Sequence, residues 1–142
     1  MQASTVREAG RSAAAAVARA LRIVVAEDDA DAAMTLVAIL RDEGYEVVRV
    51  QNGRRAVEAA RHFDPDAMIL DIGMPEMNGW DAARTIREER GERRPLLIAV
   101  SGIFTKSADR FLADMAGFNH YLTKPYDPQA LLSLLAPLRS AQ

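Results

Sequence analysis

Cysteine is absent from the 142 residues, and its absence excludes several kinds of site. Without thiols there is no disulfide framework, no thiol nucleophile and no cysteine-ligated zinc or iron–sulfur centre. Long hydrophobic runs are also missing, because Arg, Asp or Pro interrupts each apolar stretch well short of the roughly 20 residues that a membrane span needs. We therefore expect a cytoplasmic protein with no membrane span.

Clustered positive charge is scarce outside the first residues. The net charge is −2, yet residues 1–22 carry four arginines against Glu8 alone, which leaves −5 on residues 23–142. An acidic body without a Lys/Arg-rich run argues against direct nucleic-acid binding, which depends on clustered cations. The Ala/Arg-rich residues 1–21 are expected to form a helical or frayed extension without chemistry of its own, with an organellar transit peptide as the alternative.

What the sequence does contain is a regular alternation of two periodicities over one domain, residues 22–140. β-branched or apolar runs alternate with amphipathic segments and predict five strand–helix repeats. The expected strands are residues 22–26, 45–50, 66–70, 95–100 and 120–123, and the expected helices are residues 31–44, 54–63, 79–90, 106–116 and 128–138.

This alternation predicts an α/β fold, a doubly wound five-stranded parallel sheet with helices on both faces. The first and third strands are the most uniformly apolar, as expected for central strands. We therefore expect the flavodoxin-like strand order 2-1-3-4-5. In such a sheet the functional crevice lies at the carboxyl ends of strands one and three, where the winding reverses.

Polar residues end the strands at that edge. Glu27, Asp28 and Asp29 follow the first strand, Asp71 ends the third, and Ser101-Gly102 and Thr123-Lys124-Pro125 follow the last two. Clustered carboxylates repel one another and need a cation to stay ionised. Oxygen ligands without neighbouring His or Cys favour a hard ion, Mg²⁺ first and Mn²⁺ as the alternative.

These motifs resemble the CheY-like receiver domain of response regulators in two-component signalling. The matching pieces are Glu27-Asp28 after "IVV", Asp71 in "LDIGMPEMNG", Ser101 after "IAV", and Lys124-Pro125 in "YLTKP". The resemblance extends from about Arg22 to Leu138. Each motif alone is weakly specific, but four in the right order, each at a strand end, are highly specific.

The resemblance implies that Asp71 accepts a phosphoryl group from a phosphohistidine on a histidine kinase or a histidine phosphotransfer protein. Asp28 and Asp71 would contact Mg²⁺ directly, Gly73 would offer its backbone carbonyl, and Glu27 would act through a water molecule. Such a domain is no conventional enzyme, because it promotes only its own phosphorylation and dephosphorylation.

The resemblance also implies roles for the last two strand ends. Lys124 would pair with Asp71 before transfer and with a phosphoryl oxygen afterwards, while Ser101 would donate its hydroxyl near the Gly102 amide. A shift of Ser101 would let Tyr121 turn inward and alter the face formed by residues 104–138, which a downstream protein target reads. The Lys124-Pro125 peptide bond is expected to be cis.

Some residues depart from the commonest pattern of the family. Glu27 replaces the more usual aspartate and adds one methylene group. Gly73 and Ile103 occupy positions where rapidly hydrolysing members carry polar side chains that position water. We therefore predict slow autodephosphorylation.

Several residues also have simpler interpretations than a role in a receiver domain. Asp29 alone is a typical helix cap, Tyr121 is equally compatible with plain packing, and His62 and His120 are expected on the surface. The methionines are expected in the core or in packed loops, namely Met34, Met68, Met74, Met77 and Met115.

Rival functions fit the same residues less well. A flavodoxin-type redox protein binds phosphate where this chain has "EDDAD", and acids there repel phosphate. A haloacid-dehalogenase-type phosphatase needs a general acid where Gly73 stands. A phosphorylation-independent interaction module derived from a receiver remains an alternative.

The sequence says less about the pathway. No effector-domain pattern follows Leu138, so we expect a stand-alone regulator or a phosphorelay intermediate. A receiver fragment of a hybrid histidine kinase is the alternative, and the segment "AGFNHYLTKPYDP", residues 116–128, favours a relay.

Overall fold

The computed structural model describes residues 20–91, 94–102, 114 and 116–140. Its strands are β1 (Arg22–Ala26), β2 (Glu46–Val50), β3 (Ala67–Asp71), β4 (Leu96–Ser101) and β5 (His120–Thr123). Its described helices are α2 (Ala30–Asp42), α3 (Gly53–Phe63), α4 (Gly79–Arg90) and α6 (Pro128–Ser140). The helix expected over residues 106–116 lies almost entirely outside the described residues.

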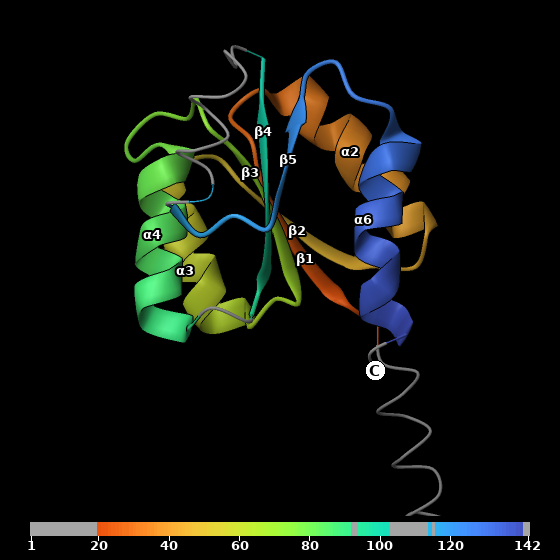
Figure 1. Ribbon diagram of the computed structural model, residues 1–142. Helices are drawn as coiled ribbons and strands as arrows, with labels where there is room; N and C mark the ends of the chain where they lie inside the picture. Colours follow the sequence, from red (N-terminus) through yellow and green to blue (C-terminus); the bar gives the residue numbers. More distant parts are fainter. Residues whose placement is uncertain (1–19, 92–93, 103–113, 115, 141–142) are drawn as a thin grey trace, which may run out of the picture.

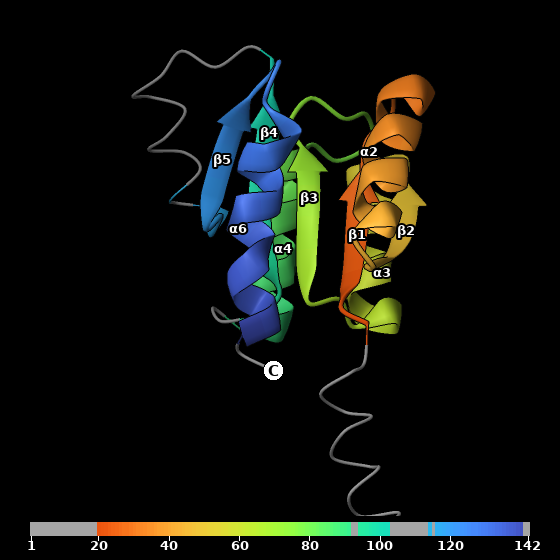
Figure 2. The same cartoon turned by 90° about the vertical axis from the view of Figure 1, so that its right-hand side faces the viewer.

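The five strands form one parallel sheet in the order β2-β1-β3-β4-β5, which confirms the predicted topology. Helices α3 and α4 cover one face and α2 and α6 cover the other (Figures 1 and 2). The register pairs Ala26 of β1 with Leu70 of β3, so the two strands end side by side. The residues that follow Ala26 and Leu70 therefore meet at one edge of the sheet.

The sheet divides the apolar interior into two cores because alternate residues of a strand point to opposite faces. Val24 and Ala26 belong to the core under α3 and α4, whereas Ile23 and Val25 belong to the core under α2 and α6. All four are almost completely buried, which explains why β1 is uniformly apolar. Full burial of each large aliphatic side chain contributes roughly 1.5–3 kcal/mol, and this anchors the strand ends that carry the polar residues.

Side chains of Asp or Asn cap three helices at the edge where the strands end. Asp29 caps α2, and its Oδ1 accepts hydrogen bonds from the backbone N–H groups of Asp31 at 2.9 Å and Ala32 at 3.3 Å. Asn52 and Asn78 cap α3 and α4 in the same way. Such caps satisfy N–H groups that have no partner within the helix. The simpler interpretation of Asp29 as a helix cap is therefore confirmed.

The expectation that Met34 packs in the core is wrong. Its side chain is 69% exposed, because α2 turns a different set of residues inward, namely Ala33, Leu36, Val37 and Leu40. These four follow the 3.6-residue period of an α-helix, and Met34 lies outside their stripe. Met68 and Met74 are buried as expected, whereas Met115 lies outside the described residues.

The described helices are too short to cross a bilayer. The longest of them, α2 and α6, have 13 residues each, or about 20 Å at 1.5 Å per residue. A hydrocarbon core is about 30 Å thick. Within the part of the chain that the structure describes, no helix meets the length and hydropathy that a membrane span requires.

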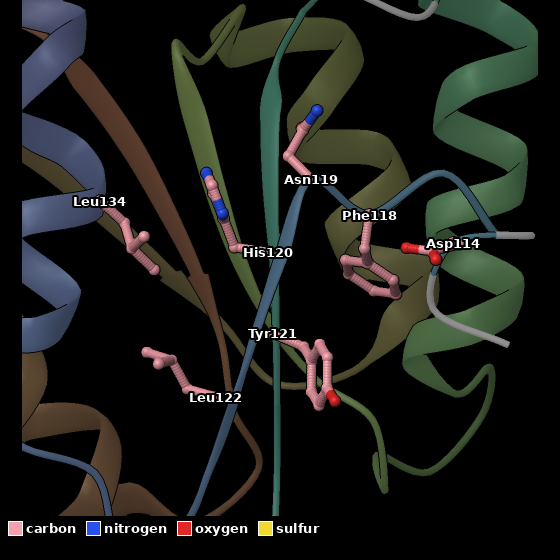
Figure 3. A pocket seen from close by; sticks show the side chains of 7 residues that line it. All are labelled: Asp114, Phe118, Asn119, His120, Tyr121, Leu122 and Leu134. Carbon is pink, nitrogen blue, oxygen red and sulfur yellow. The ribbon is translucent and has the colours of Figure 1, made fainter. Parts of the chain in front are cut away.

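Strand β5 lies at the edge of the sheet, and its side chains alternate between the two cores. Tyr121 lies on the same side of the strand as Phe118, whereas Leu122 lies on the side of Leu134 from α6 (Figure 3). These residues line a cavity of about 430 Å³. His120 is exposed, as is His62 on α3, which confirms the predicted surface positions of both histidines. Tyr121 itself is half-buried.

Candidate functional site

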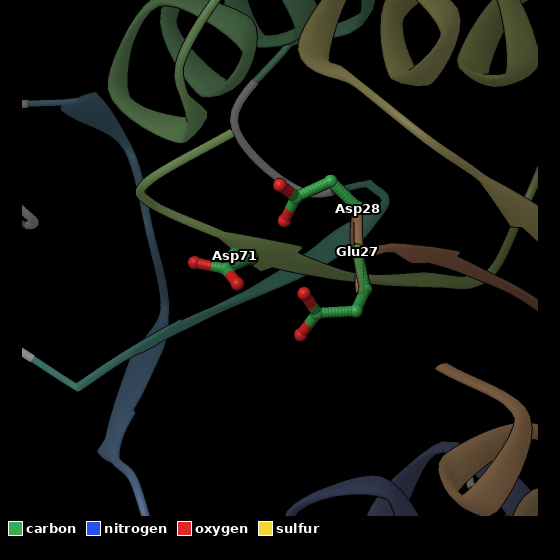
Figure 4. A group of neighbouring side chains, drawn as sticks. All are labelled: Glu27, Asp28 and Asp71. Atoms are coloured by element: carbon green, nitrogen blue, oxygen red, sulfur yellow. The ribbon is translucent and has the colours of Figure 1, made fainter. Parts of the chain in front are cut away.

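Three carboxylates converge where β1 and β3 end. Glu27 and Asp28 follow β1, and Asp71 is the last residue of β3 (Figure 4). One oxygen from each carboxylate lies within 4.8 Å of the others. The parallel register brings Glu27 and Asp71 together, because their preceding residues, Ala26 and Leu70, are paired. The structure thus gathers the three acids that the sequence placed at this edge.

Lys124 lies between two of these acids. Its Nζ donates a hydrogen bond to Oε1 of Glu27 at 2.9 Å and another to Oδ2 of Asp71 at 3.0 Å. The backbone N–H of Lys124 also donates to the carbonyl of Ser101 at 2.9 Å, which ties the end of β5 to the end of β4. The peptide bond from Lys124 to Pro125 is cis, as expected. One ammonium group therefore serves two carboxylates.

The close approach of these charged groups and their burial shift the pKa values of Glu27 and Lys124. Burial raises the pKa of Glu27, and the hydrogen bond from Lys124 opposes this rise. Burial alone lowers the pKa of Lys124, but the hydrogen bonds to Glu27 and Asp71 raise it above its ordinary value. Both directions follow from the general rule that burial disfavours charge and an opposite charge restores it. Lys124 therefore stays protonated.

The backbone around Asp71 is closely packed. The N–H of Gly73 donates to Oδ1 of Asp71 at 3.0 Å, which turns the loop after β3 back over the carboxylate. A Cβ atom on Gly79 would lie 2.8 Å from the Asp71 carbonyl oxygen and 3.0 Å from the Cα of Ile72. Glycine at position 79 thus lets the first turn of α4 lie directly against the end of β3.

The other predicted site residues lie at the ends of the neighbouring strands. Ser101 is the last residue of β4, is 3% exposed, and pairs with Thr123 of β5. A Cβ on Gly102 would lie 3.9 Å from the Cβ of Lys124, so Gly102 is beside the lysine. The side chains of the site therefore come from four strand ends. Ile103 lies outside the described residues.

A family model for the response regulator receiver domain matches residues 23–136, which is most of the chain. The chain belongs to the response regulator receiver family. A receiver domain is not a conventional enzyme, and the acidic group of this one is suited to holding a metal ion.

Curated relatives support the same assignment. The DNA-binding response regulator MtrA of Mycolicibacterium paratuberculosis is 35% identical over 112 residues, which cover 79% of this chain and 48% of that protein. The chain spans about half the length of the MtrA proteins that it matches.

Solved structures of receiver domains also resemble this one. The receiver domain of a sensor histidine kinase from Pseudomonas aeruginosa PAO1, with a magnesium ion coordinated in its active-site cleft, is 31% identical with a TM-score of 0.76. The match covers 85% of this chain and 98% of that one. The signal receiver domain of a histidine kinase from Syntrophus aciditrophicus is also 31% identical, with a TM-score of 0.77 and coverage of 86% and 92%.

One residue of this receiver domain that reaches the acidic edge escaped the sequence analysis. Arg49 lies on β2 opposite Val25 of β1, and its guanidinium group donates to the backbone carbonyls of Glu27 and Asp28. The only signal in the sequence was a polar residue inside the apolar run "YEVVRV". A polar residue in such a run predicts an edge strand, but it does not show which groups the side chain contacts.

Proposed function

We propose that residues 22–140 form a phosphoacceptor receiver domain in which Asp71 takes a phosphoryl group from a phosphohistidine. The observation that carries this proposal is the position of Asp71, which is clustered with Glu27 and Asp28 and accepts a hydrogen bond from Nζ of Lys124 at 3.0 Å. Phosphoryl transfer asks the protein mainly for alignment and for neutralising charge. The family membership of the chain supports the same role.

In the reaction, a bond forms between a carboxylate oxygen of Asp71 and phosphorus while the phosphorus–nitrogen bond of the phosphohistidine breaks. The imidazole nitrogen keeps the electron pair of the broken bond. Lys124, held at the end of β5, neutralises one phosphoryl oxygen. Ser101 donates its hydroxyl to another, with the Gly102 amide nearby. These residues come from different strands, so the sheet edge itself aligns the reacting groups.

The oxygen donors fit a divalent cation of the hard type. Asp28 and Asp71 would hold Mg²⁺ directly, Gly73 through its carbonyl and Glu27 through water, and Mn²⁺ suits the same donors. The contacts of Glu27 support a role through water and not as a direct ligand. Its two carboxylate oxygens already accept hydrogen bonds from Lys124 at 2.9 Å and from the backbone N–H of Asp29 at 3.1 Å. A bound Mg²⁺ ion supplies positive charge beside the phosphoryl oxygens.

The phosphoryl donor is a histidine kinase or a histidine phosphotransfer protein, and the output is a conformational shift in residues 104–138, of which residues 104–113 and 115 lie outside the described residues. Ser101 and Tyr121 couple the site to that region, where a downstream protein binds. The chain would act as a stand-alone regulator or a phosphorelay intermediate, and its similarity to receiver domains of histidine kinases supports a hybrid-kinase receiver as the alternative. Gly73 has no side chain to position water, so the phosphorylated form persists.

The test is intact-mass spectrometry after incubation with acetyl phosphate, with and without Mg²⁺. We expect one added phosphoryl group that requires Mg²⁺ and is absent from Asp71→Ala. Asp42→Ala is the matched control, because Asp42 is an exposed carboxylate at the far end of α2. The decay of the adduct measures the predicted slow dephosphorylation. If acetyl phosphate and a phosphohistidine donor both fail, the interaction-module alternative replaces this proposal.

A further inference from the structure

Arg49 makes three hydrogen bonds to the backbone of the two acids that follow β1. Its Nε and Nη2 both donate to the carbonyl oxygen of Glu27, at 3.0 and 2.8 Å. The same Nη2 donates to the carbonyl oxygen of Asp28 at 3.2 Å. The acceptors are therefore backbone groups of the residues whose side chains form the acidic site.

We propose that Arg49 is a positioning residue for the divalent-ion site, and this inference rests on the proposed function. Arg49 sets the direction in which the backbone leaves β1, and with it the direction of the Glu27 and Asp28 side chains. The N–H of Glu27 donates to the carbonyl of Val50 at 3.0 Å, so the last two residues of β2 hold Glu27 through both of its backbone groups.

The chemistry of arginine suits this task. The guanidinium group is a rigid planar fork of donors, so it fixes the place of the carbonyls it contacts, whereas the ammonium of lysine is a point charge on a flexible stem. Three hydrogen bonds from one half-buried side chain restrain the turn at the end of β1. Asp28 is itself exposed, so its carboxylate depends on the backbone for its direction.

The positive charge of Arg49 acts in the opposite sense, because it repels a cation bound to the same acids. A unit charge acting through solvent changes the affinity for a divalent ion by roughly severalfold. Loss of a group that orients metal ligands typically weakens binding by roughly 10- to 100-fold. We therefore expect positioning to outweigh repulsion. When the charge of Arg49 is removed, loss of positioning weakens the binding of Mg²⁺, whereas loss of repulsion strengthens it.

The experiment is a calorimetric titration of the full chain with Mg²⁺ alone, on the wild type, Arg49→Lys and Arg49→Gln. Positioning predicts that both variants bind Mg²⁺ roughly tenfold more weakly. Arg49→Lys is the decisive variant, because it keeps the charge and loses the fork. Thermal unfolding of each variant, recorded without Mg²⁺, shows which of them are folded. If Arg49→Gln does not fold, Arg49→Lys decides alone.

The matched control is Arg41→Gln. Arg41 also donates a hydrogen bond to a backbone carbonyl of β2, that of Val47 at 3.0 Å, but it lies in the last turn of α2. A purely structural role of Arg49 predicts that its variants lose stability while their affinity for Mg²⁺, like that of Arg41→Gln, stays at the wild-type value.

Each outcome supports or overturns the inference. Unchanged affinity in Arg49→Lys overturns it, as does tighter binding in Arg49→Gln, which would assign the residue to charge alone. Weaker binding in Arg49→Lys with wild-type affinity in Arg41→Gln supports it. If the wild type itself binds no Mg²⁺, the metal-dependent function proposed above fails, and this result is distinct from equal affinities in wild type and variants.

Discussion

The two ends of β3 each carry an aspartate, and the structure treats them differently. Asp66 directly precedes the strand and is 6% exposed. Its Oδ2 accepts a hydrogen bond from the backbone N–H of Arg22 at 2.8 Å, and its Oδ1 accepts one from Nη2 of Arg94 at 2.7 Å. A buried carboxylate with such partners joins three segments of the chain and needs no further ligand.

At the carboxyl end of β3 the negative charges outnumber the positive charges. Glu27, Asp28 and Asp71 gather around the single ammonium of Lys124 among the described residues, which leaves a surplus of two negative charges. Clustered carboxylates of this kind reduce stability unless a cation joins them. The carboxylate at the amino end of β3 thus has charged and polar partners within the fold, whereas the acids at the carboxyl end keep a surplus of negative charge that suits the metal binding proposed above.

The largest effect that would test this comparison is expected from Asp66→Ala. The change leaves the part-buried N–H of Arg22 and the exposed guanidinium of Arg94 without this acceptor, and we expect the free energy of unfolding to fall by about 3 kcal/mol. Urea denaturation measures this loss. A loss no greater than that of an exposed Asp→Ala control, Asp42→Ala, would contradict the structural role of Asp66.

A slightly smaller effect is expected from Mg²⁺ at the other end. The proposed Mg²⁺ site exists only in the folded chain, so the ion should raise the free energy of unfolding by about 2.7 kcal/mol at a concentration one hundred times its dissociation constant. Asp28→Asn should lose most of this gain. Urea denaturation with and without Mg²⁺ checks both, and an equal gain in Asp28→Asn would remove Asp28 from the metal site.

The smallest effect should have the opposite sign to the first. Asp71→Ala removes one of three mutually repelling carboxylates, while Lys124 keeps its hydrogen bond to Glu27. Like charges at this spacing cost about 1 kcal/mol in water, so we expect the domain without metal to become more stable by about that amount. Denaturation in the presence of a chelator measures the change. Destabilisation as large as that of Asp66→Ala would remove the difference between the two ends.

Much of the fold and the centre of the site followed from sequence patterns. The strand order followed from the alternation of strands and helices, and the meeting of Asp71 with Glu27 and Asp28 followed because parallel strands share one carboxyl edge. Lys124 could be placed for the same reason. These predictions needed only to assign each residue to a strand end, and they required no knowledge of side-chain direction.

The contacts that the sequence analysis missed depend on register and on side-chain direction. Arg49 reaches the acidic edge because β2 pairs with β1 in one particular register, and the partners of Asp66 are 44 and 28 residues away in the sequence. Met34 was misplaced because apolar character alone did not distinguish it from Leu36 and Val37, which face the sheet. Local patterns carry no information about such distant pairings, whereas the helical period of α2 does place Met34 outside the buried stripe.

Lys124 has a consequence for the domain before any ligand arrives. By touching Glu27 and Asp71 at once, it serves as an internal counter-ion that belongs to the chain and cannot diffuse away. Lys124 therefore keeps Glu27 and Asp71 together without a metal ion, so the proposed binding of Mg²⁺ would need little rearrangement of these two side chains. If Asp71 accepts a phosphoryl group as proposed above, Glu27 still offers a hydrogen-bond acceptor to the ammonium of Lys124. Lys124 thus keeps the two carboxylates in place with a positive charge that is part of the chain.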